Sequence, residues 1–185
     1  IDREGKGIRD AVRLVNLPIW NAYSFFCLYA NTDGIRARLR SDSRELLDRY
    51  LLAKTRELVE GLQSDFDAYE LSSACGRVTA FLDALTNWYI RRSRPRFWGS
   101  VTPESAADKQ AGYDTLYTAL VTLCRAASPL LPLLSEEIHR GLTGERSVHL
   151  QDWPEVAALP CAPELVAQMD RVREVCSAAL ALRAE

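Results

Sequence analysis

Apolar residues recur at intervals of three or four along most of this chain, which is the spacing that lines one face of an α-helix. Such stripes extend over residues 8–29, 47–66, 71–89 and 113–127, and they predict four long helices. Pro18 lies within the first stripe. Because its ring removes one backbone hydrogen bond, we expect a kink there rather than the end of the helix.

Polar segments between the stripes indicate where the helices begin and end. Residues 31–42 form a connection, after which Asp42 and Glu45 have the spacing of a capping box at the start of the second helix. Gly99 closes the third helix, and Thr102 is expected to cap the fourth. The connections are short, which predicts that neighbouring helices run antiparallel.

The last third of the chain has a weaker pattern. A short helix is expected from Ser135 to Gly141, because acidic residues fill its first turn and a glycine follows its last apolar position. Residues 147–154 alternate apolar and polar side chains and predict an extended strap across the bundle. Pro163 opens a final helix.

These elements define an all-α fold, an antiparallel helix bundle of four long helices with a short helix, an extended strap and a C-terminal helix. The 185 residues, 48% of them hydrophobic, suit a single domain with a continuous core. Residues 5–160 would form the bundle and strap, and residues 161–185 the start of the C-terminal helix. The predicted core residues of the third helix include Val78, Phe81 and Leu85.

Composition excludes several classes of protein. The net charge is −2 and the pI is near 5.8, so any affinity for nucleic acid would be local rather than spread over the whole surface. The five cysteines form no CxxC pair, and four of them fall on apolar helix faces. This pattern predicts small buried hydrophobes in a cytoplasmic, reducing compartment, without disulfides or a zinc site. No apolar run approaches the ~20 residues that span a membrane. The chain starts without methionine and stops within a helical pattern, so we expect it to be a piece of a longer protein.

One segment concentrates positive charge and aromatic rings. Residues 87–98, NWYIRRSRPRFW, contain Arg91, Arg92, Arg94 and Arg96 and no acidic residue. Guanidinium groups are permanently charged and pair with anionic oxygens, and aromatic rings stack on bases. The pattern favours binding of a polyanion. The alternative is a helix end whose arginines cap carbonyls and lie in solvent.

Antiparallel packing would bring more arginines to the same end of the bundle. The first and third helices end at the same pole, so Arg36, Arg38 and Arg40 of the first connection should lie near the arginines of the third helix. Residues 129–170 carry seven acidic and two basic residues and begin at the opposite pole. We therefore expect an electrical dipole with a cap of seven arginines.

The residue patterns of a catalytic or metal site are missing from the sequence. The only histidines, His139 and His149, have no ExxH or HxxxH partner, and Glu136 and Glu137 face different sides of a helix. GxGxxG, GxxxxGK[ST] and GxSxG sequences are also missing. We therefore expect a binding module with no catalytic residue, no metal ligand and no cofactor of its own.

Four segments of the sequence resemble class I isoleucyl-tRNA synthetases. They are LPIWNAYSFFCLYANTDG (17–34), LTNWYIRRSRPRFW (85–98), SPLLPLLSEEIHRGL (128–142) and SVHLQDWP (147–154), in the order and spacing of that family. The resemblance covers nearly the whole chain and is to the helical anticodon-binding domain that follows the catalytic domain. The RRSRPRFW sequence after NWYI points to the isoleucyl branch.

The resemblance implies a cytoplasmic, monomeric parent enzyme that ligates isoleucine to tRNA(Ile) with ATP and Mg, with Zn as a further candidate. The catalytic signatures HIGH and KMSKS are missing from this sequence, as is the editing domain. The partners of this fragment would therefore be tRNA(Ile) and the catalytic and editing domains of the same chain, with no membrane.

In related synthetases the anticodon loop meets the end of the first helix and the loop after it. Carried over to this sequence, the resemblance implies contacts from Asn21, Tyr23, Ser24, Arg36, Arg38 and Arg40. Trp98 or Tyr89 would be available for stacking on a base only if exposed. The main alternative is a protein-interaction bundle whose arginine cap docks an acidic partner or another domain of its own chain.

Overall fold

The protein is described by a computed structural model that covers residues 5–184, and within them every regular element is helical. The all-α prediction is therefore confirmed. The α-helices are α1 (Lys6–Ala11), α2 (Leu17–Asp33), α3 (Leu46–Asp67), α4 (Leu71–Asp83), α5 (Arg91–Trp98), α6 (Ala106–Ala127), α7 (Pro132–Thr143) and α8 (Pro163–Ala184). The π-helical segments are η1 (Val12–Asn16) and η2 (Ala84–Ile90), and the 3-10 turns are η3 (Val148–Leu150) and η4 (Val156–Ala158).

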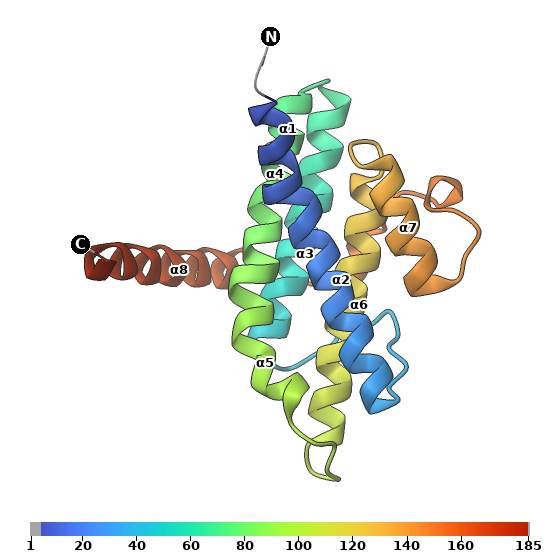
Figure 1. Ribbon diagram of the computed structural model, residues 1–185, viewed down its shortest axis with the longest axis vertical. Coiled ribbons are helices and arrows are strands. Elements are labelled where there is room, and N and C mark those ends of the chain that lie inside the picture. The colour runs from blue at the N-terminus through green and yellow to red at the C-terminus, as the bar shows by residue number, and fades with distance from the viewer. Residues whose placement is uncertain (1–4, 185) are drawn as a thin grey trace.

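The long helices lie side by side along the long axis of the molecule (Figure 1). α2 descends in this view, α3 returns, α4 and α5 descend together, and α6 returns again. This alternation confirms the antiparallel arrangement expected from the short connections. α7 lies beside α6 on one flank of the bundle, whereas α8 projects sideways from the other.

The C-terminal helix α8 is held mainly by its first half. Val166 is buried in the bundle, and the Tyr50 hydroxyl of α3 donates a hydrogen bond to the carboxylate of Asp170 at 2.6 Å. Farther along, Val175 is 63% exposed and Leu182 is 74% exposed. The predicted helix is confirmed, and its second half extends away from the bundle. None of the described helices, α8 included, is long and apolar enough to cross a membrane.

The first predicted helix is continuous but irregular. α1, η1 and α2 follow one another without a break, and η1 ends two residues before Pro18. Pro18 has no N–H to donate to the carbonyl of Leu14, and the wider π spacing accommodates that loss. The helix therefore continues past Pro18 as predicted, and a π-helical segment marks the irregularity.

The predicted capping box at the start of the second helix is wrong. The Asp42 carboxylate accepts hydrogen bonds from Nε and Nη2 of Arg40, at 2.9 and 2.7 Å, and lies outside α3. The helix begins at Leu46, and Glu45 at the N-cap position makes no side-chain cap. An ion pair with the neighbouring arginine has replaced the expected cap.

Three other predicted helix ends are misplaced. α6 begins at Ala106, because Thr102 shapes a preceding turn in which its carbonyl accepts the Ala106 N–H at 2.9 Å. α7 begins at Pro132, where a proline needs no backbone donor, and continues through Gly141. It ends before Gly144, whose φ of 73° is the left-handed conformation that favours glycine.

The expected extended strap at 147–154 contains the 3-10 turn η3 instead of a uniform extended segment. The Glu136 carboxylate of α7 accepts hydrogen bonds from the Ser147 hydroxyl at 2.9 Å and from the Val148 N–H at 2.8 Å. Val148 is buried against the bundle. The segment still crosses the bundle surface, but local hydrogen bonds to α7 bend it into a turn.

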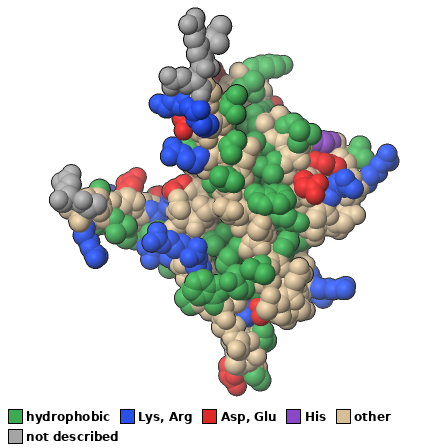
Figure 2. Space-filling view, in the orientation of Figure 1, with side chains coloured by type: hydrophobic (Ala, Val, Ile, Leu, Met, Phe, Trp, Pro, Cys, Tyr) green, Lys and Arg blue, Asp and Glu red, His purple; other side chains and the backbone are tan. Residues whose placement is uncertain are grey.

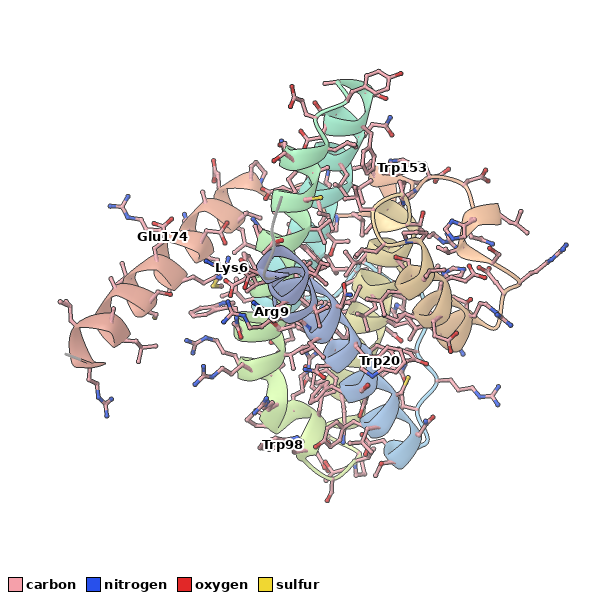
Figure 3. All side chains as sticks on the ribbon, turned by 45° about the horizontal axis from the view of Figure 1, so that its top comes forward. Lys6, Arg9, Trp20, Trp98, Trp153 and Glu174 are labelled. Atoms are coloured by element: carbon pink, nitrogen blue, oxygen red, sulfur yellow. The ribbon has the colours of Figure 1, made fainter. Side chains whose placement is uncertain are left out.

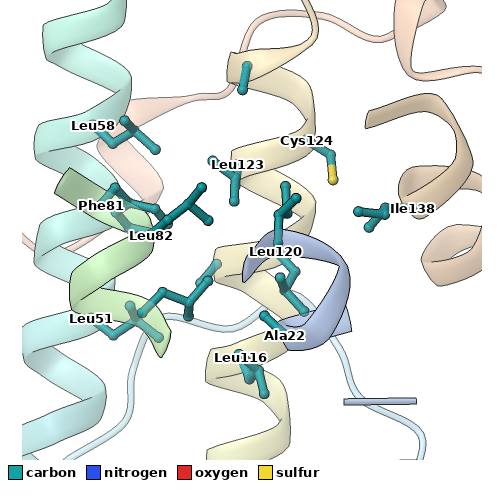
Figure 4. Packing of buried hydrophobic residues seen from close by; sticks show 14 of the residues in the cluster. Ala22, Leu51, Leu58, Phe81, Leu82, Leu116, Leu120, Leu123, Cys124 and Ile138 are labelled. Carbon is teal, nitrogen blue, oxygen red and sulfur yellow. The ribbon is translucent and has the colours of Figure 1, made fainter. Parts of the chain in front are cut away.

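The interior of the bundle is a continuous apolar layer between α2, α3, α4 and α6 (Figure 4). Leu51 of α3, Leu82 of α4 and Leu120 of α6 meet there with no more than 1% exposure. The predicted core residues Val78, Phe81 and Leu85 are 2%, 3% and 0% exposed, so this prediction is confirmed.

The cysteines are free, as the sequence predicted, but they do not all lie in the core. Cys124 is buried in α6, and burial raises the pKa of its thiol to about 12, which makes it unreactive. Cys75 and Cys161 are exposed, so their interpretation as buried hydrophobes is wrong. An apolar stripe therefore does not by itself tell a core cysteine from a surface one.

Candidate nucleic-acid interface

Three arginines project from the helix turns at the lower end of the bundle. Arg91, Arg92 and Arg94 of α5 are exposed, whereas Ser93 and Phe97 on the other face are buried. The Phe97 ring packs edge-on against Tyr113 of α6, with 4.9 Å between ring centroids. The packed face of α5 thereby turns the three guanidinium groups outward.

Two of these arginines lie over tryptophan rings. The guanidinium carbon of Arg92 is 3.6 Å from the centroid of Trp88, and that of Arg94 is 5.7 Å from the centroid of Trp98. Trp88 is only 8% exposed, so Arg92 covers a ring that already belongs to the protein interior. Trp98 is 57% exposed and lies at the outer end of α5 (Figure 3). Trp98 is therefore the ring of the segment that retains a face for stacking on a base.

Arg96 does not belong to this exposed group, which corrects the prediction for that residue. Its Nη1 lies 2.7 Å from the Asp48 carboxylate of α3, and its Nη2 lies 2.7 Å from the Asp108 carboxylate of α6. The side chain is 14% exposed. Burial alone would lower the pKa of Arg96, but the hydrogen bonds and attraction from Asp48 outweigh it and raise that pKa. Arg96 is an internal ion-pair residue.

The connection after α2 is fixed to α6 by its backbone. The N–H of Arg38 donates to the Asp114 carboxylate at 2.9 Å, and the N–H of Arg40 donates to the Thr118 hydroxyl at 2.9 Å. The carbonyl of Arg36 accepts a hydrogen bond from the Gln110 side chain at 3.1 Å. The connection is therefore an irregular segment whose backbone is hydrogen-bonded to α6 at every second residue. That spacing leaves the side chains on the outer side.

The three arginines of the connection are exposed but not equivalent. Arg40 pairs with Asp42, and its hydrogen bonds hold the pKa of that carboxyl group below its usual range. Among the described residues, Arg36 and Arg38 form no ion pair. Arg36 and Arg38 are therefore the cations of the connection that remain available to an external anion.

The three positions of α2 implied by the resemblance point in different directions. Asn21 and Ser24 are exposed, whereas Tyr23 is half-buried against α7. Burial and a hydrogen bond with Cys27 raise the pKa of Tyr23 to about 12. Tyr23 therefore forms a contact between helices, and its role in RNA binding stays a prediction.

Two open grooves adjoin the arginines. One, of about 580 Å³, lies between α2 and the α4–η2–α5 helix and is lined by Asn21, Asn87 and Arg94, among others. The other, of about 920 Å³, lies between that helix and α8 and contains Arg91 and Arg92 together with acidic residues of α8. The first groove combines amide groups with two cations, Arg13 and Arg94, and with the carboxylate of Asp83. In the second groove, carboxylates offset part of the positive charge.

The predicted cap of seven arginines is smaller and less continuous than expected. The end of α2 and the end of α5 do lie at the same end of the bundle, as the antiparallel arrangement requires (Figure 1). Arg96 and Arg40 form ion pairs with carboxylates. The other five of the seven arginines are exposed and have no ion pair among the described residues: Arg36, Arg38, Arg91, Arg92 and Arg94. Figure 2 shows the basic side chains of one face in several separate groups.

Neither histidine is arranged for catalysis. His139 is buried in α7, and its Nε2 lies 2.9 Å from the Glu145 carboxylate. His149 lies 3.2 Å from the carbonyl of Pro132. Within residues 5–184, no group of three or more His, Cys, Asp or Glu side chains could hold a metal ion. The chemistry that the described surface offers is recognition through guanidinium, amide and aromatic groups.

Comparison with known proteins agrees with this surface chemistry. Residues 48–185 match the family described as the anticodon-binding domain of tRNA ligase. The chain belongs to this family. An isoleucine–tRNA ligase of Leifsonia xyli is 54% identical over 178 residues, one of Mycobacterium tuberculosis is 51% identical over 178 residues, and one of Wolbachia pipientis is 45% identical over 184 residues. These alignments cover 96%, 96% and 99% of this chain but only 16% of each relative. The anticodon-binding domain is therefore a small part of the relatives that carry it.

Proposed function

We propose that this chain is the tRNA-binding domain of an isoleucine–tRNA ligase and that it holds the anticodon stem and loop of tRNA(Ile). The remainder of the polypeptide would carry out ATP-dependent aminoacylation, with Mg and with Zn as a further candidate. Membership of the anticodon-binding family and the relatives named isoleucine–tRNA ligase support this function. We further propose that the whole enzyme acts as a cytoplasmic monomer.

The observation that carries the proposal is the set of arginines at one end of the bundle that have no ion pair within residues 5–184. Arg91, Arg92 and Arg94 emerge from one helix turn, and Arg36 and Arg38 emerge from the neighbouring connection. Elsewhere, many basic side chains form ion pairs with carboxylates, as Arg77 does with Asp65, where Nε and Oδ2 are 2.6 Å apart. Guanidinium groups gathered at one end of the bundle can bind external anions, and nucleic-acid phosphates supply a row of them.

Family membership favours RNA over the alternative of an acidic protein partner. An acidic protein would also be attracted to these arginines, but it would not distinguish one tRNA from another. Asn21 and the exposed Trp98 ring add hydrogen-bonding and stacking groups that a base can use. We therefore expect preference for tRNA(Ile) over a tRNA with a different anticodon.

The experiment is a titration of labelled tRNA(Ile) with the 185-residue chain at several salt concentrations. Arg94→Gln and Arg38→Gln should each lower the magnitude of the salt slope by about 0.7–0.9 for every phosphate that the variant no longer neutralises. Arg140→Gln, at an exposed position on α7, is the control and should leave the slope unchanged. If both variants bind with wild-type affinity and slope, these arginines do not touch the RNA and the proposal fails.

A further inference from the structure

Arg96 joins three helices at the end of the bundle where the unpaired arginines lie. Its Nη1 and Nη2 donate to the two oxygens of Asp48 at 2.7 and 3.0 Å, and its Nε donates to Asp108 at 2.9 Å. The Tyr89 hydroxyl also donates to Asp48, at 2.8 Å, which leaves that buried carboxylate well satisfied. Arg96 therefore connects α5 to α3 and α6 through a fork of directed hydrogen bonds, a geometry that lysine cannot reproduce.

The surface of α6 is shaped to receive this guanidinium group. A Cβ atom at Gly112 would lie 3.0 Å from Cζ of Arg96 and 3.1 Å from its Nε, closer than ordinary packing allows. The Arg96 side chain therefore lies flat against a helix position that has no side chain. Gly112, Asp48 and Asp108 therefore form a site that fits the Arg96 side chain in shape and in charge. A surface ion pair would need the charge alone.

The helix turn that carries the exposed arginines needs such an anchor. α5 has eight residues and contains Pro95, which has no N–H to donate to the carbonyl of Arg91. The same turn presents Arg92, Arg94 and Trp98 to solvent. Since its own backbone is missing one hydrogen bond, its orientation depends on how Arg96 and Phe97 pack against the rest of the bundle.

A second buried cation fixes the adjoining segments to the same helix. Nζ of Lys109 on α6 lies 2.7 Å from the Asp33 carboxylate and donates to the carbonyl of Gly99 at 2.5 Å. Asp33 is the last residue of α2, directly before the connection, and Gly99 directly follows α5. Both arginine-bearing segments are therefore held to α6 by buried ionic interactions.

We propose, resting on the tRNA-binding function proposed above, that Arg96 is a positioning residue for RNA recognition. It does not touch the RNA. It holds the last turns of the α4–η2–α5 helix in the orientation that binding requires, so that little conformational entropy is lost when the RNA binds. The arginines of the RRSRPR segment (91–96) thus have two roles, in which Arg92 and Arg94 face the ligand and Arg96 faces the protein.

Salt dependence separates positioning from direct phosphate binding. Arg94→Gln should reduce the salt slope of tRNA(Ile) binding by about 0.7–0.9, because one phosphate is no longer neutralised. Arg96→Gln should weaken binding by about tenfold with an unchanged slope, because the bound state neutralises the same phosphates and only the cost of ordering rises. A slope reduction in Arg96→Gln equal to that of Arg94→Gln would overturn the proposal.

Two further variants remove the ambiguity between charge and geometry. Arg96→Lys keeps the positive charge but not the fork, so it should bind as weakly as Arg96→Gln, whereas a simple phosphate interaction would be largely retained. Asp48→Asn removes a negative charge, which should strengthen attraction to a polyanion if charge alone mattered. Positioning predicts weaker binding for Asp48→Asn. Tighter binding than wild type would contradict it.

Hydrogen exchange tests positioning without any RNA. In the free 185-residue chain, Arg96→Lys should raise the exchange of backbone amides in residues 91–99 by about tenfold or more, because local opening becomes easier. Arg77→Gln is the matched control, since it breaks the ion pair with Asp65 near the other end of α3. It should leave both the exchange of residues 91–99 and the affinity for tRNA(Ile) at wild-type values.

The two proposals fail in different ways. If the wild-type chain binds no tRNA(Ile), the proposed function fails, and the exchange measurement still decides whether Arg96 orients the turn. If the wild type binds but Arg96→Lys shows wild-type exchange and affinity, the proposed function stands and the positioning role of Arg96 is wrong.

Discussion

The Tyr23 hydroxyl group of α2 occupies the space directly over Gly141 of α7. A Cβ atom at position 141 would touch the hydroxyl oxygen and lie 2.9 Å from the ring carbon that bears it. Gly141 therefore does not end a helix, as its sequence context suggested, but allows two helices to approach each other. The same close approach explains why Tyr23 is half-buried against α7.

Replacing Gly141 with alanine should destabilise the fold. The added methyl group must displace the Tyr23 ring, and overpacking of this kind costs about 1–3 kcal/mol. Alanine has a higher helix propensity than glycine, but that gain is about 1 kcal/mol or less and does not offset the overpacking. Gly76→Ala is the control, because Gly76 is an exposed helical glycine with no neighbouring atom within 4 Å of its Cβ position. Urea unfolding should show a loss for Gly141→Ala and a small gain for Gly76→Ala. Equal gains for both would mean that Tyr23 moves aside at no cost.

Leu85→Ala should lower the free energy of unfolding by about 2–5 kcal/mol, since a fully buried side chain is removed and leaves a cavity. Leu71→Ala, at a position that is 58% exposed in the same helix, should cost much less. The two variants remove the same atoms, so the difference between their unfolding midpoints measures burial. Similar midpoints would mean that Leu85 is no more buried than Leu71 and that a different face of α4–η2 packs in the core.

The ion pair between Arg77 and Asp65 should stabilise the protein only above the acidic range. The hydrogen bond from Arg77 is the main cause that holds the pKa of Asp65 below its ordinary value. A depressed carboxyl pKa contributes stability that is present above the unfolded-state value of about 3.9 and is lost as the pH falls through the folded-state value. Arg77→Gln should therefore unfold more readily than wild type at pH 7, and the difference in unfolding free energy should shrink as the pH falls below the unfolded-state value of about 3.9. A difference independent of pH would assign the loss to packing of the Arg77 side chain.

Hydrophobic spacing was sufficient to predict the helices and their order. The 3.6-residue period reports which face of a helix is buried, and this holds for Val78, Phe81 and Leu85 regardless of the partners they meet. Helix ends were less predictable because several local signals compete there. Asp42 could cap α3 or pair with Arg40, and only the folded chain shows that the ion pair forms.

The candidate site was predicted as a region more accurately than as individual residues. Antiparallel topology is enough to bring the connection after α2 and the helix α5 to the same end of the bundle (Figure 1). Whether an arginine faces solvent or protein depends on partners far away in the sequence. Arg96 finds Asp48, which is 48 residues away. One signal was available, because Arg96 follows Tyr89 by seven residues and so continues the buried face of its helix.

Trp98 should contribute to RNA binding through its ring rather than to stability. Its 57% exposure leaves one face for a base, while Arg94 lies 5.7 Å from its centroid. Trp98→Ala should weaken tRNA(Ile) binding by about 1–3 kcal/mol if one base stacks there, and Trp98→Phe should retain most of the affinity. The salt slope should not change, because the arginines still neutralise the same phosphates.

The matched control for Trp98 is Trp88, ten residues earlier in the same helix and also under an arginine. Trp88 is 8% exposed and packs against Tyr50 and Val166, so Trp88→Ala should lower the free energy of unfolding by about 3–5 kcal/mol. Trp98→Ala should change it by about 0.5 kcal/mol or less, as expected for a surface position. Thermal melts and tRNA titrations of both variants measure the two roles separately. If Trp98→Ala binds tRNA(Ile) as tightly as wild type, the exposed ring is not a stacking platform, and recognition at this end of the bundle rests on the arginines.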